Sequence, residues 1–146
     1  MSLDITYRPA TPAEVNVLAH TFDTTTDELS QGLPSLLLCY CPGGTRIIKE
    51  GDLGQDVFCI LRGHVVVEKK WLGWFSQRVA RLGMGDVFGE MGFLKTAGGR
   101  SASVTTEGDC RLFRMNAGEL NQLMLAAPAI GSRLQQISRH HILGLR

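Results

Sequence analysis

Residues 43–67 read GGTRIIKEGDLGQDVFCILRGHVVV, a series of short apolar runs separated by glycine and polar residues. The same pattern of short apolar runs and glycines extends from Leu36 to Met115. Short apolar or alternating runs bounded by turn residues are typical of β-strands. The glycines between these runs recur about every ten residues, a spacing that suits an antiparallel sandwich or barrel. They are Gly43, Gly44, Gly51, Gly54, Gly63, Gly73, Gly83, Gly85 and Gly108. The sequence therefore predicts a mainly β domain over this region.

Helical patterns flank the β region on both sides. Thr11-Pro12-Ala13-Glu14 combines an N-cap residue, a proline at the first helical position and an acidic first turn, so we expect a short helix there. Asp23–Gly32 has no clean periodicity and is predicted to be a loop or a frayed turn. Beyond Met115, Asn116–Glu119 has the pattern of a capping box, and Pro128 is placed to start a second helix.

An apolar stripe follows the second of these C-terminal helices. Its members recur at steps of four, three and four residues, and they are Ile130, Leu134, Ile137 and His141. We expect the stripe to pack either on the β region or on a second copy of itself. On that basis we predict a homodimer through the C-terminal helix.

Length and composition limit the organisation and the partners of the chain. It has 146 residues, enough for one hydrophobic core and too few for two. We therefore predict a single domain over 1–146, with an N-terminal helix and loop in 1–35, the β region in 36–115 and the C-terminal helices in 116–146. The formal net charge is only +1 and the basic residues are scattered, which argues against nucleic-acid binding by this chain.

The longest apolar run, Leu36–Tyr40, is far too short to cross a bilayer. We therefore expect no membrane partner and a cytoplasmic location. The four cysteines form no CxxC pair, so neither a zinc site nor a disulfide framework is indicated, and buried thiols are expected. Cys39 and Cys41 would share one face of a strand, but no third and fourth ligand for a soft metal lies nearby in the sequence.

A different pattern interrupts the strands at residues 85–104, which read GDVFGEMGFLKTAGGRSASV. Gly89 and Gly92 permit close approach of the backbone, and Glu90–Lys95 is long enough for one helical turn whose free N–H groups would face an anion. Arg100 adds a fixed positive charge and a planar fork of donors that matches phosphate geometry. Together these features predict an anion site.

This stretch resembles the phosphate-binding cassette of the cyclic nucleotide-binding domain family, to which the catabolite activator protein and the regulatory subunits of protein kinase A belong. The glycine frame at 43–67 and the helical tail at 116–138 are also similar to the roll and the closing helices of that family. The resemblance implies an eight-stranded antiparallel β-roll, of the double-stranded β-helix or jelly-roll type, with an N-terminal helix and two C-terminal helices. It also implies a regulatory domain that is not an enzyme and needs no cofactor or metal.

The resemblance further implies a role for each residue of the cassette. Glu90 would accept a hydrogen bond from the ribose 2′-hydroxyl, and Arg100 would pair with the charged oxygens of the cyclic phosphate. The phosphate site would be completed by backbone N–H groups at Gly89, Met91 and Ala102 and by the hydroxyl of Ser101.

The same resemblance bears on the base. A serine directly after the arginine, Ser101, favours cyclic AMP over cyclic GMP, and His141 or Leu145 in the last helix would cap the base. The full set of expected ligand contacts is Phe88, Gly89, Glu90, Met91, Gly92, Arg100, Ser101, Ala102 and His141.

We expect nucleotide occupancy to reposition the C-terminal helices, which would act on a fused or separate effector domain. A cupin-like metal-dependent enzyme is an alternative, because that fold has a similar sequence pattern of short strands separated by glycine. Such a site needs clustered His and Glu ligands, whereas His64 has no histidine two residues away and Glu68 stands alone. The other alternative is a β-roll that serves as a ligand-free interaction domain.

Some of these residues also have a purely structural interpretation. Glu90 and Arg100 could pair with each other on the surface, and Gly89 and Gly92 could serve only turns. Gly73 marks the tip of a hairpin, where clustered aromatic residues brace strands or meet another protein. The aromatic residues at this tip are Trp71, Trp74 and Phe75.

Overall fold

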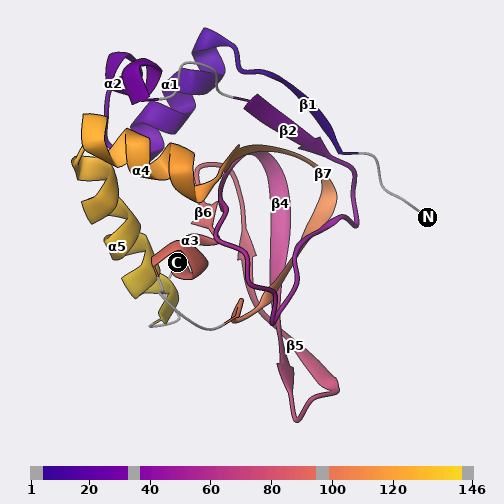
Figure 1. Cartoon of the computed structure of the whole chain (residues 1–146). Coiled ribbons are helices and arrows are strands. Elements are labelled where there is room, and N and C mark those ends of the chain that lie inside the picture. The colour runs from indigo at the N-terminus through magenta and orange to yellow at the C-terminus, as the bar shows by residue number, and fades with distance from the viewer. Residues whose placement is uncertain (1–4, 33–36, 95–98, 143–146) are drawn as a thin grey trace.

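The computed structural model describes residues 5–32, 37–94 and 99–142, and their strands form one antiparallel sheet that curls into a roll (Figure 1). The order along the sheet is β1-β2-β7-β4-β5, with β3 paired to β7 and β6 paired to β4. The strands are β1 (Thr6–Pro9), β2 (Leu37–Cys41), β3 (Arg46–Ile48), β4 (Val57–Trp71), β5 (Phe75–Leu82), β6 (Val87–Phe88) and β7 (Ser103–Met115). The predicted β-roll with flanking helices is confirmed.

The described residues form seven strands, whereas eight were expected, because runs separated by glycine in the sequence join into continuous strands. The 15-residue β4 contains both VFCIL and HVVVEKK, and its register against β7 shifts on either side of Arg62. Gly63 lies at this bend with φ 96°, and a Cβ there would lie 2.5 Å from the carbonyl oxygen of Asp109. The glycine therefore bends one long strand around the roll instead of ending it.

The longer helices gather on one side of the roll, and the short α3 lies beside the last of them (Figure 1). The helices are α1 (Pro12–Thr21), α2 (Thr26–Gly32), α3 (Glu90–Leu94), α4 (Ala117–Ala126) and α5 (Ala129–Ile142). The predicted N-cap at Thr11 and the predicted capping box at Asn116 are confirmed, and Thr11 also forms a capping box with Glu14. Ile130 and Leu134 of the α5 stripe are fully buried in a core shared with α1, α4 and the sheet. The stripe thus packs within its own chain, and a homodimer through α5 would have to use other faces of the helix.

The N-terminal region holds more structure than the predicted helix and loop. Strand β1 precedes α1, and α2 occupies most of the segment that was predicted to be a loop, so that prediction is wrong. The helix begins because Thr25 accepts a hydrogen bond from the backbone N–H of Glu28 at 3.1 Å, as an N-cap does. Leu29 then anchors the short helix by burying its side chain completely.

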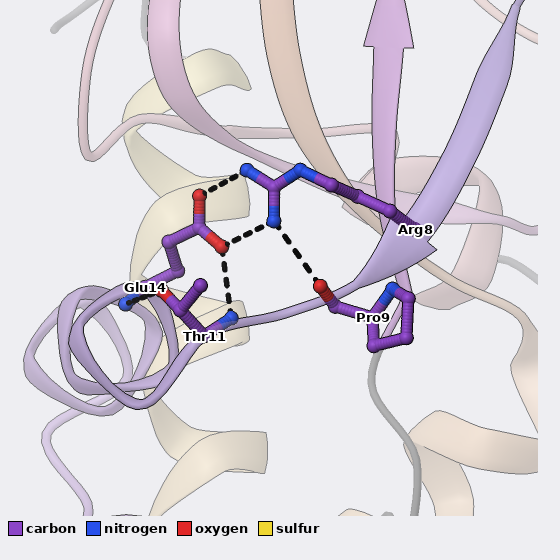
Figure 2. A network of polar contacts seen from close by, with 4 residues as sticks. All are labelled: Arg8, Pro9, Thr11 and Glu14. Atoms are coloured by element: carbon purple, nitrogen blue, oxygen red, sulfur yellow. Dashed lines mark hydrogen bonds and ion pairs between the residues drawn. The ribbon is translucent and has the colours of Figure 1, made fainter.

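A polar network fixes the turn between β1 and α1 (Figure 2). Both Nη atoms of Arg8 donate to the carboxylate of Glu14, at 2.8 and 2.6 Å. The backbone N–H of Thr11 donates to the same carboxylate at 2.9 Å. The hydrogen bonds from Arg8, followed by those from Thr11, lower the pKa of Glu14 to about 2.

The four cysteines are free and buried, as expected. The sulfur atoms of Cys39 and Cys41 lie 3.5 Å apart on one face of β2. Among the described residues, no helix has the length and apolar character needed to span a bilayer.

Candidate functional site

A cavity of about 440 Å³ lies between the roll, the segment around α3 and the end of α5. All nine residues expected to contact a ligand line it: Phe88, Gly89, Glu90, Met91, Gly92, Arg100, Ser101, Ala102 and His141. Apolar side chains of the roll form much of the remaining wall, and they are Ile48, Val67, Val79, Ala80, Leu82 and Val104. Phe88 is held in the wall by stacking on Phe58, with ring centroids 5.0 Å apart. A volume of this size suits a small organic ligand.

Arg100 is the cation of the cavity and is held by main-chain carbonyls. Its Nη1 donates to the carbonyl oxygen of Gly89 at 2.7 Å, and its Nη2 donates to that of Asp56 at 2.8 Å. Its own backbone is fixed to the loop before β4, by bonds to Gly51 and Asp52 at 2.8 and 2.7 Å. A guanidinium has five N–H donors, so these two side-chain bonds leave donors free while setting the direction of the fork.

The charge of Arg100 is buried without a carboxylate partner. The residue is 8% exposed, and among the described residues no carboxylate lies within ion-pair distance of its guanidinium. The alternative of a surface pair between Glu90 and Arg100 is therefore wrong. Burial lowers the pKa of Arg100, and the nearby charges of Asp56, Glu90 and Asp52 oppose that shift. Because arginine stays protonated at neutral pH even so, the cavity contains a fixed positive charge.

Glycine gives the guanidinium the space that it occupies. Gly92 lies inside α3, and a Cβ at this position would lie 2.5 Å from Nη1 of Arg100. At Gly54 a Cβ would lie 3.1 Å from Nη2. The interpretation of Gly92 as a turn residue is therefore wrong, since its role in the structure is to let the arginine pass close to the helix backbone.

Glu90 places a carboxylate in the wall of the cavity where α3 meets α5. Its side chain is 1% exposed, and its Oε1 lies 2.7 Å from Nδ1 of His141 in the last turn of α5. Among the described residues, Oε1 has no other polar partner. The first residue of α3 and the end of α5 are thus joined by a contact that closes one side of the cavity. Leu145, the second residue expected to cap a base, lies outside the described residues.

The sequence interpretation missed the loop that holds Arg100. Asp56 has two functions there, because its carbonyl accepts from Arg100 while its carboxylate pairs with Arg114 at 2.7 Å. The only available signal was the GDLGQD stretch of the glycine frame, which contains both Gly54 and Asp56. Lys69, which also lines the cavity from β4, was not predicted either.

The comparison with known families agrees with this geometry. The family model described as "Cyclic nucleotide-binding domain" matches residues 39–127, more than half of the chain. The chain belongs to the cyclic nucleotide-binding domain family. The match extends from β2 to the end of α4 and includes the whole cassette at 85–104.

Individual relatives of this cyclic nucleotide-binding domain agree in sequence and in fold. The cyclic AMP receptor protein of Thermus thermophilus is 33% identical over 93 residues, which are 64% of this chain and 43% of that protein. This chain thus spans less than half the length of that relative. A cyclic nucleotide-binding domain from Methylobacillus flagellatus superposes with a TM-score of 0.82 at 21% identity, covering 95% of this chain and 84% of that one. The regulatory domain of Toxoplasma gondii PKA, solved with cAMP, gives 0.73 at 22% identity, covering 88% and 48%.

The cupin-like alternative would need a metal centre in the same roll. Among residues 5–32, 37–94 and 99–142, no group of three His, Cys, Asp or Glu side chains could hold a metal ion. The contacts of the nine cavity residues with a ligand stay predictions.

Proposed function

We propose that this domain binds a cyclic nucleotide monophosphate in the 440 Å³ cavity, prefers cyclic AMP to cyclic GMP, and relays occupancy through α5 without catalysing a reaction. The ligand would be the only small molecule required, with no cofactor, and the regulation would take place in the cytoplasm. The effector is a fused or separate domain.

The observation that carries the proposal is the buried and unpaired charge of Arg100. Removing a guanidinium from water is unfavourable unless a counter-charge compensates it. The two carbonyls direct the fork but carry no net charge. A cyclic phosphate supplies one negative charge and several acceptor oxygens, which matches the remaining donors of the fork.

The remaining walls suit the other parts of a nucleotide. The apolar side chains of the roll would cover the base, and the carboxylate of Glu90 would accept a hydrogen bond from a ribose hydroxyl. Because Glu90 is almost completely buried, such a bond would be made away from competing water. The ligand would therefore be recognised by a cation at one end and a carboxylate acceptor beside it.

The preference for cyclic AMP is supported by Ser101, which follows the arginine as in the catabolite activator protein. The relatives described above point the same way, since one is named a cyclic AMP receptor protein and another was solved with cAMP.

The relay is supported by the contact between Glu90 and His141. A ribose hydroxyl on Glu90 would reach the same carboxylate that His141 of α5 contacts at 2.7 Å. Binding would thereby change the interaction that holds the end of α5 to α3. A ligand shifts an equilibrium only by its difference in affinity for the two states, and this shared carboxylate provides such a difference.

Titration calorimetry with cyclic AMP and cyclic GMP tests the binding. Arg100→Ala should weaken cyclic AMP binding by roughly 2–4 kcal/mol, or about 30- to 700-fold in Kd. The matched control is Arg62→Ala, which removes an exposed arginine of β4 and should leave Kd unchanged. Equal affinity of the two variants would contradict the role of Arg100, and no binding of either nucleotide by the unmodified chain would favour the ligand-free interaction domain.

Hydrogen exchange tests the relay separately. Cyclic AMP should change the protection of amides in α5, and His141→Ala should remove that change. His140→Ala is the control, because its exposed imidazole lies next to His141 in the sequence and should leave the response intact. Ligand binding with no change in α5 would contradict the relay while preserving the binding proposal.

A further inference from the structure

The β4–β5 hairpin projects from the roll, at the end opposite to α1 and α2 (Figure 1). Its tip is the segment Trp71–Phe75, with sequence WLGWF, which is called the aromatic tip below. Strand β5 is the last strand in the order and pairs with β4 alone. The aromatic tip therefore stands clear of the body of the domain.

The aromatic tip is strongly apolar and exposed to solvent. The exposed fractions are 52% for Trp71, 87% for Leu72, 79% for Trp74 and 53% for Phe75. Trp74 and Phe75 meet edge to face, with ring centroids 6.3 Å apart, so part of their surface is shared. Neither tryptophan belongs to the core of the fold. The apolar residues are thus not explained by packing within the chain.

The conformation of Leu72 shows that the turn itself does not require an apolar residue. Leu72 has φ 56° and Gly73 has φ 81°, the positive values typical of the two central residues of a type I′ turn, and the backbone N–H of Trp74 donates to the carbonyl oxygen of Trp71 at 3.4 Å. Asn, Asp or Gly suit the first of these positions, whereas a leucine there is strained. The sequence therefore places a large apolar side chain, 87% exposed, at a turn position where its backbone conformation is strained.

Basic residues outnumber acidic ones at the base of the aromatic tip. Between positions 68 and 81 the hairpin contains four basic residues and one acidic residue, Glu68, which accepts from the hydroxyl of Ser76 at 3.0 Å. The carboxylate of Glu50 also lies near, 3.0 Å from the backbone nitrogen of Lys70. Arg78 and Arg81 lie near Glu107, at 3.7 and 2.6 Å, whereas the exposed Lys69 and Lys70 have no ion-pair partner among the described residues. The apolar apex is thus followed by two lysines without an ion-pair partner among the described residues, an arrangement complementary to a surface that is apolar inside and anionic outside.

We propose that the aromatic tip inserts into the interfacial region of a membrane whose surface carries anionic lipid headgroups. The tip extends roughly two residues beyond Lys70, about 7 Å at the rise of a strand, which matches the depth of about 5–10 Å reached by interfacial side chains. At that depth the tryptophan rings lie at the headgroup boundary, which tryptophan prefers, and the two lysines lie beside the phosphates. The sequence expectation of no membrane partner rested on the absence of a spanning run, and it does not address this shallow contact.

The shape of the tip favours a membrane over a protein partner. The hairpin is convex, so a protein would have to offer a deep apolar pocket with an acidic rim. A fluid lipid surface accepts a narrow projection without a preformed pocket. The aromatic tip itself contributes no residue to the wall of the cavity, but Lys69 lines it, so the membrane contact is tested without nucleotide.

Tryptophan fluorescence tests the proposal directly, because both tryptophans of the chain lie in the aromatic tip. The full chain is titrated with vesicles of phosphatidylcholine alone and with vesicles containing phosphatidylserine at about 30 mol%. We expect a blue shift of the emission and co-sedimentation only with the anionic vesicles, weakened by salt. Absence of binding to anionic vesicles overturns the proposal.

Three variants distinguish insertion into lipid from contact between two copies of the chain. Leu72→Asn suits the turn and should raise the melting temperature, yet should weaken vesicle binding at least about tenfold. Lys69→Gln and Lys70→Gln should each weaken binding by roughly fivefold, the effect of one basic residue near an anionic surface. Normal vesicle binding by Leu72→Asn overturns the proposal. So does a blue shift that depends on protein concentration without vesicles, because the tip would then be the contact between copies.

Discussion

Replacing Gly92 by alanine tests whether the space around the guanidinium of Arg100 is required for binding. The added methyl group would lie 2.5 Å from Nη1 of Arg100 and 2.8 Å from the carbonyl oxygen of Gly54. Ordinary contact begins at 3.4 Å, so the guanidinium has to retreat by most of an ångström. Its bonds of 2.7 and 2.8 Å to Gly89 and Asp56 would then exceed the usual limit of about 3.2 Å for a hydrogen bond.

The size of the effect follows from the interaction that is lost. A displaced Arg100 guanidinium loses at least one charge-assisted hydrogen bond to the phosphate, which contributes about 2–3 kcal/mol. Kd for cyclic AMP should therefore rise roughly 30- to 140-fold. Alanine is the better helix former by about 1 kcal/mol, which should offset part of the strain and keep the domain folded. Titration calorimetry measures the affinity, and a thermal melt measures the folding.

Gly118→Ala provides the matched control. Gly118 also lies in a helix, but a Cβ there would meet only Asn116 Oδ1 at 3.4 Å. This variant should be as stable as the unmodified domain or more so, with unchanged affinity. If Gly92→Ala binds cyclic AMP within about twofold of Gly118→Ala, the guanidinium is not positioned for the ligand as proposed.

Three further predictions concern the fold, and urea denaturation measures each. Gly63→Ala combines a positive φ with a Cβ 2.5 Å from a backbone oxygen, and it should lower the free energy of unfolding by about 2–4 kcal/mol. The control is Gly44→Ala, which has φ 83° and open space around the Cβ and should lower the free energy of unfolding by only about 1 kcal/mol. Arg8→Gln should lower the free energy of unfolding at pH 7, because Glu14 then loses its bidentate partner. The pKa of Glu14 is lowered from 4.5 to about 2 in the folded protein. The difference in the free energy of unfolding between Arg8→Gln and the unmodified domain should therefore be complete above pH 4.5 and disappear as the pH falls through 2. Leu134→Ala removes a fully buried side chain and should cost about 2–5 kcal/mol, and a loss below about 1 kcal/mol would contradict the packing of α5 on its own chain.

The sequence was informative wherever one local pattern determines one local structure. The N-cap and proline at Thr11-Pro12 and the capping box at Asn116 predicted where α1 and α4 begin, and the run at 85–104 predicted the short helix before Arg100. Thr25-Thr26-Asp27-Glu28 has the same capping pattern, but the polar, seven-residue helix that follows offers too few apolar positions to show a period.

Other features could not be predicted because they depend on residues that are distant in the sequence or on the backbone. The backbone carbonyl of Asp56 accepts a hydrogen bond from Arg100. Because any residue at position 56 would present a carbonyl, this contact cannot be predicted from the side chains. Likewise the contact between Glu90 and His141 exists only because α5 turns back to α3. The joining of short runs into β4 depends on how Gly63 bends the strand against β7.

The use of main-chain carbonyls to orient Arg100 has a consequence for acidity and for sequence change. A carbonyl does not titrate, so acid cannot discharge the groups that aim the guanidinium as it would discharge a supporting carboxylate. Nor can a point substitution delete an amide oxygen. A homologue with another side chain at position 56 would lose the ion pair with Arg114 but could still present the arginine in the same direction, provided that the backbone path is preserved.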